Sequence, residues 1–113
     1  AIARRLRDTD VPAFQDTYGW IQYRRGNFDE AITYLEPAAA GLPEDLLAQI
    51  HYCLALAATG QTERAVTQLE KALSGAGDSI LPQVPVATEA LKTLKSGQSY
   101  TPPYVIPAGG VAP

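Results

Sequence analysis

His51 and Cys53 are the two residues whose side chains could take part in nucleophilic or metal chemistry. An imidazole can act as a base and a thiolate as a nucleophile or a ligand, but only where the two side chains converge. On a helix, residues two positions apart point about 200° away from each other, so this pair cannot form a dyad or share one ion. We therefore predict that Cys53 is a small buried packing residue and that His51 lies at a surface or an interface. No catalytic residue and no metal site is predicted.

Composition and charge exclude further classes of function. The chain has 113 residues, with 9 Lys and Arg against 12 Asp and Glu, and its net charge of -3 argues against binding to nucleic-acid phosphates. A single Cys can form neither an internal disulfide nor a thiolate metal cage. No apolar run approaches the ~18 residues of a membrane span. These observations predict one folded domain without a cofactor.

The chain repeats itself with a period of 34 residues, which predicts a repeat architecture. The windows 12–45 and 46–79 form the two predicted units and share nine identities. The identical pairs are Gln15 with Gln49, Tyr18 with Tyr52, Gly26 with Gly60, Ala31 with Ala65, Thr33 with Thr67, Leu35 with Leu69, Glu36 with Glu70, Ala38 with Ala72, and Gly41 with Gly75.

Each unit is predicted to contain two antiparallel helices. In the first unit, Gly26 is expected to end the first helix in a left-handed conformation, and the second helix is predicted over 28–41. The second unit follows the same plan over roughly 45–58 and 62–74. Small residues would allow the two helices of a unit to approach closely. The residues expected to define the repeat are Gly19, Gly26, Ala31, Ala38, Cys53, Gly60, Ala65 and Ala72.

Two local features of the second helix in the first unit give further predictions. Asn27 and Glu30 have the spacing of a capping box, in which each side chain accepts a hydrogen bond from the backbone of the other residue. Pro37 lies inside the helix, lacks a backbone donor and clashes with the Thr33 carbonyl. A kink or a break is therefore expected at Pro37.

The two ends of the chain differ from the repeats. Residues 1–11 are typical of the last turns of a preceding repeat helix and a linker, and 80–96 is predicted to be a helix that caps the array. Residues 97–113 are rich in Pro and Gly and carry no charge, which predicts an extended tail. We expect this tail to dock in a groove of its own or a neighbouring chain, through Tyr100, Tyr104 and Ile106.

The period and its small residues resemble the tetratricopeptide repeat. Gly19, Ala31, Ala38, Pro43, Cys53, Ala65 and Ala72 stand at matching positions, and residues 26–31 are similar to the family's turn between helices. The resemblance implies an all-α solenoid, a right-handed superhelix of antiparallel helix pairs with a C-terminal capping helix. Residues 16–31 are also similar to the last repeats of longer bacterial members, which implies a bacterial origin. The compartment is unknown; for a soluble part of such a longer protein it is the bacterial cytoplasm or periplasm.

The resemblance further implies a concave groove that holds a peptide or partner segment. Carried over by position, the groove residues are Asp16, Trp20, Tyr23, Arg24, Leu47, Ile50, Leu54 and Ala58. Trp20 and Tyr23 are either an aromatic anchor for a partner or packing residues, and Arg24 either pairs with an acidic ligand group or interacts with the helix dipole. The function expected is that of a protein-interaction adaptor.

A self-assembling segment is the alternative function. The face around Phe14, Tyr18 and Ile21 has no upstream unit to cover it, which predicts either self-association or further repeats in a longer protein. Groove or tail contacts between copies would give a homo-oligomer. The partner of an adaptor is not identified by the sequence beyond being a protein or peptide.

Overall fold

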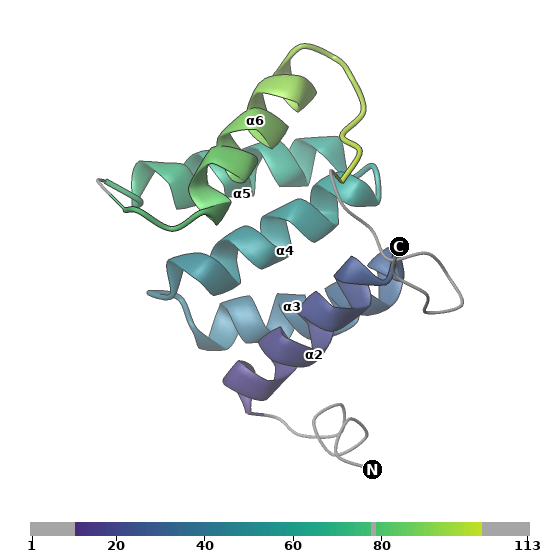
Figure 1. Ribbon diagram of the computed structural model, residues 1–113, viewed down its shortest axis with the longest axis vertical. Helices are drawn as coiled ribbons and strands as arrows, with labels where there is room; N and C mark the ends of the chain where they lie inside the picture. The colour runs from purple at the N-terminus through teal and green to yellow at the C-terminus, as the bar shows by residue number, and fades with distance from the viewer. Residues whose placement is uncertain (1–10, 78, 103–113) are drawn as a thin grey trace.

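Five helices make up the part of the chain that the structure, a computed structural model, describes: residues 11–77 and 79–102. Within these residues there is no strand. The helices pack in sequence, each against the next, in one stack (Figure 1). They are α2 (Pro12–Arg24), α3 (Phe28–Gly41), α4 (Leu46–Ala58), α5 (Thr62–Ser74) and α6 (Gln83–Lys95). The predicted helix remnant before residue 11, and the tail residues Tyr104 and Ile106, lie outside the described residues.

The period of the sequence is also the period of the helices. Moved along the chain by one period, the bounds of α2 coincide with those of α4, and the first residue of α3 coincides with the first residue of α5. The turns repeat as well, because Gly26 and Gly60 have φ angles of 86° and 80°. Only glycine adopts such angles without a steric penalty. The prediction that Gly26 ends the first helix in a left-handed conformation is confirmed.

Small residues bring the helices of the first unit into close contact. A Cβ atom added to Gly19 of α2 would lie 2.6 Å from Cγ of Leu35 and 3.1 Å from the carbonyl oxygen of Ala31, both in α3. Ala31 and Leu35 have no exposed surface. Glycine at position 19 therefore allows α3 to pack directly on the backbone of α2, as the sequence predicted.

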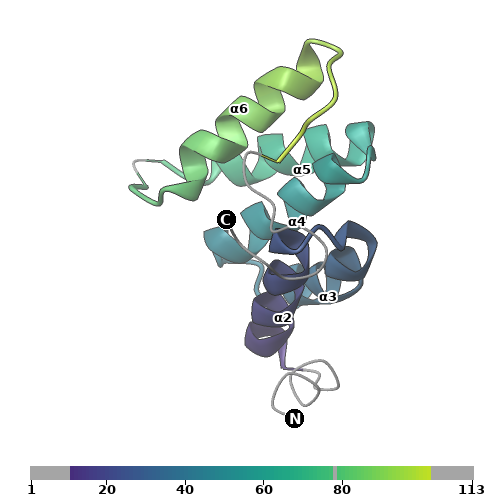
Figure 2. The ribbon, with the colours of Figure 1, turned by 45° about the vertical axis from the view of Figure 1, so that its right-hand side comes forward.

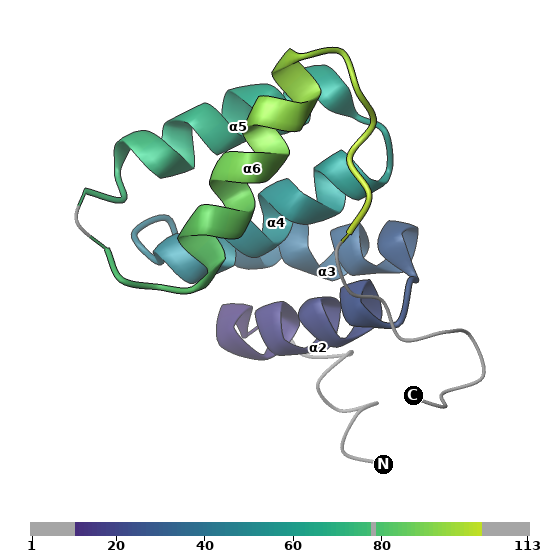
Figure 3. The same ribbon diagram turned by 45° about the horizontal axis from the view of Figure 1, so that its top comes forward.

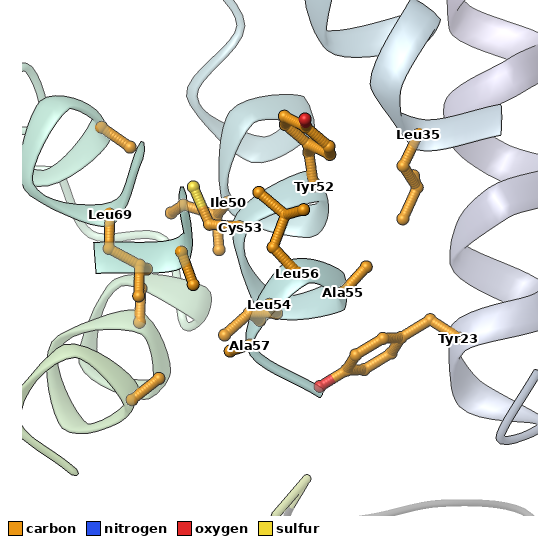
Figure 4. Packing of buried hydrophobic residues seen from close by; sticks show 14 of the residues in the cluster. Tyr23, Leu35, Ile50, Tyr52, Cys53, Leu54, Ala55, Leu56, Ala57 and Leu69 are labelled. Atoms are coloured by element: carbon orange, nitrogen blue, oxygen red, sulfur yellow. The ribbon is translucent and has the colours of Figure 1, made fainter. Parts of the chain in front are cut away.

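The core is centred on α4, which packs against all four other helices. Every residue from Ile50 to Ala57 is buried, so this helix has no solvent-facing stripe in its central part. Its sequence from Leu46 to Ala58 carries no Asp, Glu, Lys or Arg, as expected for a helix surrounded on all sides. Figure 4 shows Leu35 and Tyr23 approaching α4 from one side and Leu69 from the other.

Two local predictions for α3 need correction. Asn27 makes no side-chain capping bond, because its Nδ2 donates to Oε1 of Gln22 at 2.8 Å instead. Of the kink or break predicted at Pro37, the break is wrong, because the helix continues through Pro37. Pro37 is exposed, whereas Leu35 and Ala38 on either side of it are buried. Packing of these flanking side chains holds the helix together across the position where one backbone hydrogen bond is lost.

The last helix ends in the same way as the first helices of the two units. Gly97 has a φ angle of 88°, and the amide of Gln98 donates to the carbonyl of Thr93 at 3.2 Å, as Asn27 does to Gln22 and Gln61 to Leu56. Residues 98–102, which we call the strap, then run without helical structure. Thr101 precedes Pro102, and a residue before proline is disfavoured in the helical conformation.

The strap crosses the stack of helices. Figure 3 shows it running from the end of α6 past α4 toward the end of α2, and Figure 2 shows α6 and α2 at opposite ends of the stack. The predicted capping helix is therefore followed by a segment that returns toward the first unit.

Candidate functional site

Aromatic rings gather where the C-terminal half of α2 faces α4. Trp20 stacks on Tyr23 with ring centroids 4.4 Å apart and on His51 with centroids 3.9 Å apart. Tyr23 also makes an edge contact with Phe28 at 5.4 Å. Tyr23 and His51 are buried, whereas Trp20 is half-buried. The indole is thus an accessible part of a ring cluster in which Tyr23 and His51 are fixed in the protein interior.

A hydrogen bond to a carboxylate fixes the His51 ring beneath Trp20. Nδ1 of His51 donates to Oδ1 of Asp16 at 2.9 Å, and the exposed fractions of the two side chains are 5% and 17%. Of the two places predicted for His51, a surface or an interface, the surface is wrong, because its side chain is buried against Asp16 and Trp20. The Asp16 carboxylate, predicted to face a partner, is engaged inside the protein. Because their separation along the chain is close to one period, the repeat could have indicated that Asp16 and His51 are neighbours on adjacent first helices.

A cavity of about 370 Å³ opens beside this cluster. We call it the Trp20 cavity, and it lies between α2, α4, the start of α6 and the strap. Its size is within the range of ligand pockets. The lining residues are Trp20, Tyr23, Arg24, Leu54, Pro82, Gln83, Val86 and Tyr100.

Tyr100 of the strap lies against the same cluster. Its hydroxyl is 3.1 Å from the hydroxyl of Tyr23, and its half-buried ring packs against the core. Burial raises the pKa of both phenols above the ordinary value of 10.0. Of the three tail residues predicted to dock, Tyr100 is the one that the structure describes.

The predicted groove residues separate into two groups. Trp20, Tyr23, Arg24 and Leu54 meet at the Trp20 cavity, although Tyr23 and Leu54 present little surface there. Ile50 has no exposed surface, so a direct contact between Ile50 and a partner is excluded. The reason is that α4 is surrounded by other helices, whereas α2 is not. Leu47 and Ala58 are half-buried and do not line this cavity.

The described residues show no constellation for catalysis. Cys53 is buried on the side of α4 that faces Leu69 (Figure 4), as predicted, and burial raises the pKa of its thiol to about 12. A thiol with this pKa carries almost no thiolate near neutral pH. In residues 11–77 and 79–102, no three His, Cys, Asp or Glu side chains come close enough together to hold a metal ion. None of the five helices is long and apolar enough to cross a membrane.

Sequence reasoning missed a polar cluster between α3, α4 and α5. Arg64 donates to the hydroxyl of Tyr52 at 2.6 Å and to Oε2 of Glu36 at 3.2 Å. Gln49 donates to the carbonyls of Ala39 and Leu42 at 2.8 and 2.9 Å, at the end of α3. These contacts join the two units. In the sequence, the only sign of these contacts was that Tyr18 and Gln15 recur one period later as Tyr52 and Gln49.

The comparison with protein families identifies the repeat. Residues 22–81 match the family model described as tetratricopeptide repeat, and this match spans more than half of the chain. The chain belongs to the tetratricopeptide repeat family. Tetratricopeptide repeats generally mediate protein–protein interactions and are typically not enzymes. Searches of curated proteins and of solved structures gave no significant match.

Membership in the tetratricopeptide repeat family accounts for the paired helices and for the small residues between them. The match begins at Gln22 and ends at Leu81, so it covers α3, α4 and α5 in full. Trp20 and the strap lie outside the matched residues. The Trp20 cavity is therefore lined partly by residues within the match and partly by residues outside it.

Proposed function

We propose that this chain is a protein-interaction module that binds an extended partner segment at the Trp20 cavity. The observation that carries the proposal is the half-buried indole of Trp20, stacked on two buried rings at the edge of a cavity formed by three helices. Trp is among the residues that contribute most to protein interfaces when they line well-packed pockets. The family assignment supports the same class of function.

The surroundings of Trp20 favour binding because they are already ordered. His51 is held by Asp16, and Tyr23 is buried between Trp20 and Phe28. A ring cluster fixed in this way loses little conformational freedom when a partner arrives. Apolar surface from Val86 and Pro82 completes the cavity, so an apolar or aromatic side chain of the partner is the expected occupant.

The test begins with peptides selected on the full chain from a random display library. This chain has a single Trp, so binding at the cavity is expected to change the Trp fluorescence directly. Trp20→Ala is expected to weaken binding of the selected peptides by about 30-fold or more, as for an interface hot spot. Helix content measured by circular dichroism shows whether each variant remains folded.

Arg24 and Arg25 supply a matched pair of variants. Both side chains are exposed at the end of α2, but only Arg24 lines the cavity. Arg24→Glu is expected to change the affinity of the selected peptides, whereas Arg25→Glu leaves it unaltered. Peptides that bind wild type, Trp20→Ala and Arg24→Glu equally well would overturn the proposal.

Self-assembly through α2 is the second candidate function, and one observation favours it. Phe14 and Ile21 are 47% and 45% exposed on the outer face of α2, as the sequence predicted. Their equivalents one period later, Ala48 and Ala55, are buried in the second unit, where α3 packs on α4. Tyr18, predicted to be exposed on the same face, is instead buried and makes an edge contact with Tyr34.

Sedimentation velocity over a range of concentrations tests this second candidate. If α2 faces of two copies pair, the wild-type chain associates and Phe14→Glu with Ile21→Glu converts it to a monomer. Thr88→Glu is the control, because Thr88 is exposed on α6, at the opposite end of the stack from α2 (Figure 2). A wild-type chain that stays monomeric at high concentration would contradict self-assembly.

A further inference from the structure

Tyr100 separates two cavities that would otherwise form one trough. The Trp20 cavity lies on one side, and on the other side a cavity of about 520 Å³ lies between α6 and the strap. The two cavities share Val86 and Tyr100 as lining residues. Withdrawal of the strap would therefore join them into one surface that extends from α2 along α6.

The contacts of Tyr100 are those of a bound ligand side chain. Its ring is half-buried against the core, and its hydroxyl meets the hydroxyl of Tyr23 at 3.1 Å. Its neighbours Ser99 and Thr101 are exposed. The Tyr100 side chain thus holds the strap on the groove, while Gln98, Ser99 and Thr101 remain exposed.

The strap has the backbone expected of a bound peptide. It has no helical structure and runs drawn out along the helices (Figure 3), and Pro102 restricts the residue before it to extended conformations, which lowers the entropy lost on docking. Two further prolines, Pro82 and Pro85, line the surfaces on which it lies. The strap occupies the groove from within the same chain, so its effective concentration is far above that of a free peptide.

We infer that the strap is an internal ligand of the Trp20 cavity, that Tyr100 holds the place of an aromatic side chain of the partner, and that partner binding releases the strap. This inference rests on the function proposed above, because it concerns the same cavity. The partner it fits is an extended, proline-containing segment with a tyrosine, a chemistry that the strap itself displays. Arg24 lines the Trp20 cavity, and Glu89 lines the cavity between α6 and the strap. These two side chains can pair with oppositely charged residues on either side of the tyrosine in such a segment.

The first experiment needs no natural partner, because the strap sequence is the probe. A synthetic peptide of residues 97–102 is titrated against the full chain carrying Tyr100→Ser, and Trp20 fluorescence is recorded. Saturable binding is expected, and none with the same peptide carrying Ala in place of Tyr. Wild type is expected to bind the probe about tenfold more weakly, as when nine chains in ten keep their own strap docked. Equal binding of both peptides, or of neither, overturns the inference.

Quenching of Trp20 by acrylamide gives a second measurement on the free chains. Release of the strap in Tyr100→Ser is expected to raise the quenching constant relative to wild type, whereas Tyr100→Phe, which keeps the ring, lies between the two. Far-UV circular dichroism confirms that α2 to α6 remain folded in each variant. Identical quenching in all three chains would show that Tyr100 does not cover Trp20 in solution, and would overturn the inference.

The display-selected peptides separate this inference from the proposed function. If they bind at Trp20 about tenfold more tightly to Tyr100→Ser than to wild type, the strap competes with them. If they bind at Trp20 with unchanged or lower affinity in Tyr100→Ser, the proposed function stands and the inference fails. If none binds at Trp20, the proposed function fails, and binding of the strap peptide in trans still supports Tyr100 as a ligand of the cavity.

Discussion

The close contact between Gly19 and Leu35 predicts that Gly19→Ala destabilises the chain when Leu35 is present but not when Leu35 is shortened to Ala. Replacing Gly19 by Ala adds a methyl group whose carbon would lie 2.6 Å from Cγ and 2.9 Å from Cδ2 of Leu35. Gly→Ala inside a helix stabilises by about 0.5–1 kcal/mol through lower unfolded-state entropy. Overpacking a filled site costs about 1–3 kcal/mol. A net loss of up to about 2.5 kcal/mol is therefore expected for Gly19→Ala.

Shortening Leu35 removes the atoms that oppose the new methyl group. Leu35→Ala alone is expected to destabilise by about 2–5 kcal/mol because it leaves a cavity in the core. Of the three atoms closest to the new Cβ, this background removes both Leu35 atoms and leaves the Ala31 carbonyl oxygen, at 3.1 Å. Gly19→Ala is then expected to be neutral or stabilising. The coupling energy between the two substitutions should therefore be about 1–3 kcal/mol.

Urea denaturation followed by circular dichroism measures all four chains of this cycle. Gly75→Ala is the control, because the closest atom to a Cβ at Gly75 lies 3.7 Å away and its backbone is helical. It should not destabilise the chain. If Gly19→Ala lowers the free energy of unfolding equally with Leu35 and with Ala at position 35, close approach of α2 and α3 does not explain the glycine.

Four other outcomes follow from the structure. Pro37→Lys, which introduces the residue type found at the equivalent position of α5 (Lys71), is expected to stabilise the chain by about 1–3 kcal/mol, because the Thr33 carbonyl regains a backbone donor. A lower free energy of unfolding in urea would contradict this. Asp16→Ala is expected to cost about 1–3 kcal/mol, because the buried Nδ1–H of His51 loses its acceptor, and Asp16→Asn less; equal losses would argue against the hydrogen bond. Docking of Tyr100 is expected to weaken as the pH rises above 10.0, because burial raises the pKa of Tyr23 and Tyr100 and the docked state therefore favours protonated phenols. Trp20 emission is expected to report this release, and the change should be absent in Tyr100→Ser. Cys53 is expected to react with an aromatic disulfide only as fast as urea unfolds the chain, because its pKa of about 12 leaves little thiolate; rapid reaction without urea would show that Cys53 is accessible.

The period of the sequence predicted the helices because the residues that recur stand at positions where few other residue types fit. Gly26 and Gly60 need left-handed backbone, and Gly19 and Ala31 need the absence of a larger side chain. Such requirements act locally or between two adjacent helices. They are therefore visible in a single sequence as positions that recur once in each unit.

The environment of His51 and Ile50 could not be read in the same way. Both lie on α4, which packs against all four other helices, α6 included. The strap follows α6 and runs past α4 (Figure 3). One period earlier, the equivalents of these two residues, Asp16 and Thr17, lie on α2, which packs against α3 and α4, whereas α4 packs against all four other helices. Burial of a groove position thus depends on where its unit stands in the array, which the period does not encode.

The end of α6 shows how a repeat position can acquire a different use. Gly97 closes α6 with the backbone conformation that Gly26 and Gly60 give to α2 and α4, and in both earlier units a second helix follows at once. At the corresponding place the chain instead continues into the strap, because Thr101 and Pro102 disfavour a helix. A second helix there would pack beside α6, as α3 packs beside α2. The extended strap reaches Tyr23 in α2, so the proline that ends the repeat pattern is also what allows Tyr100 to meet the Trp20 cavity.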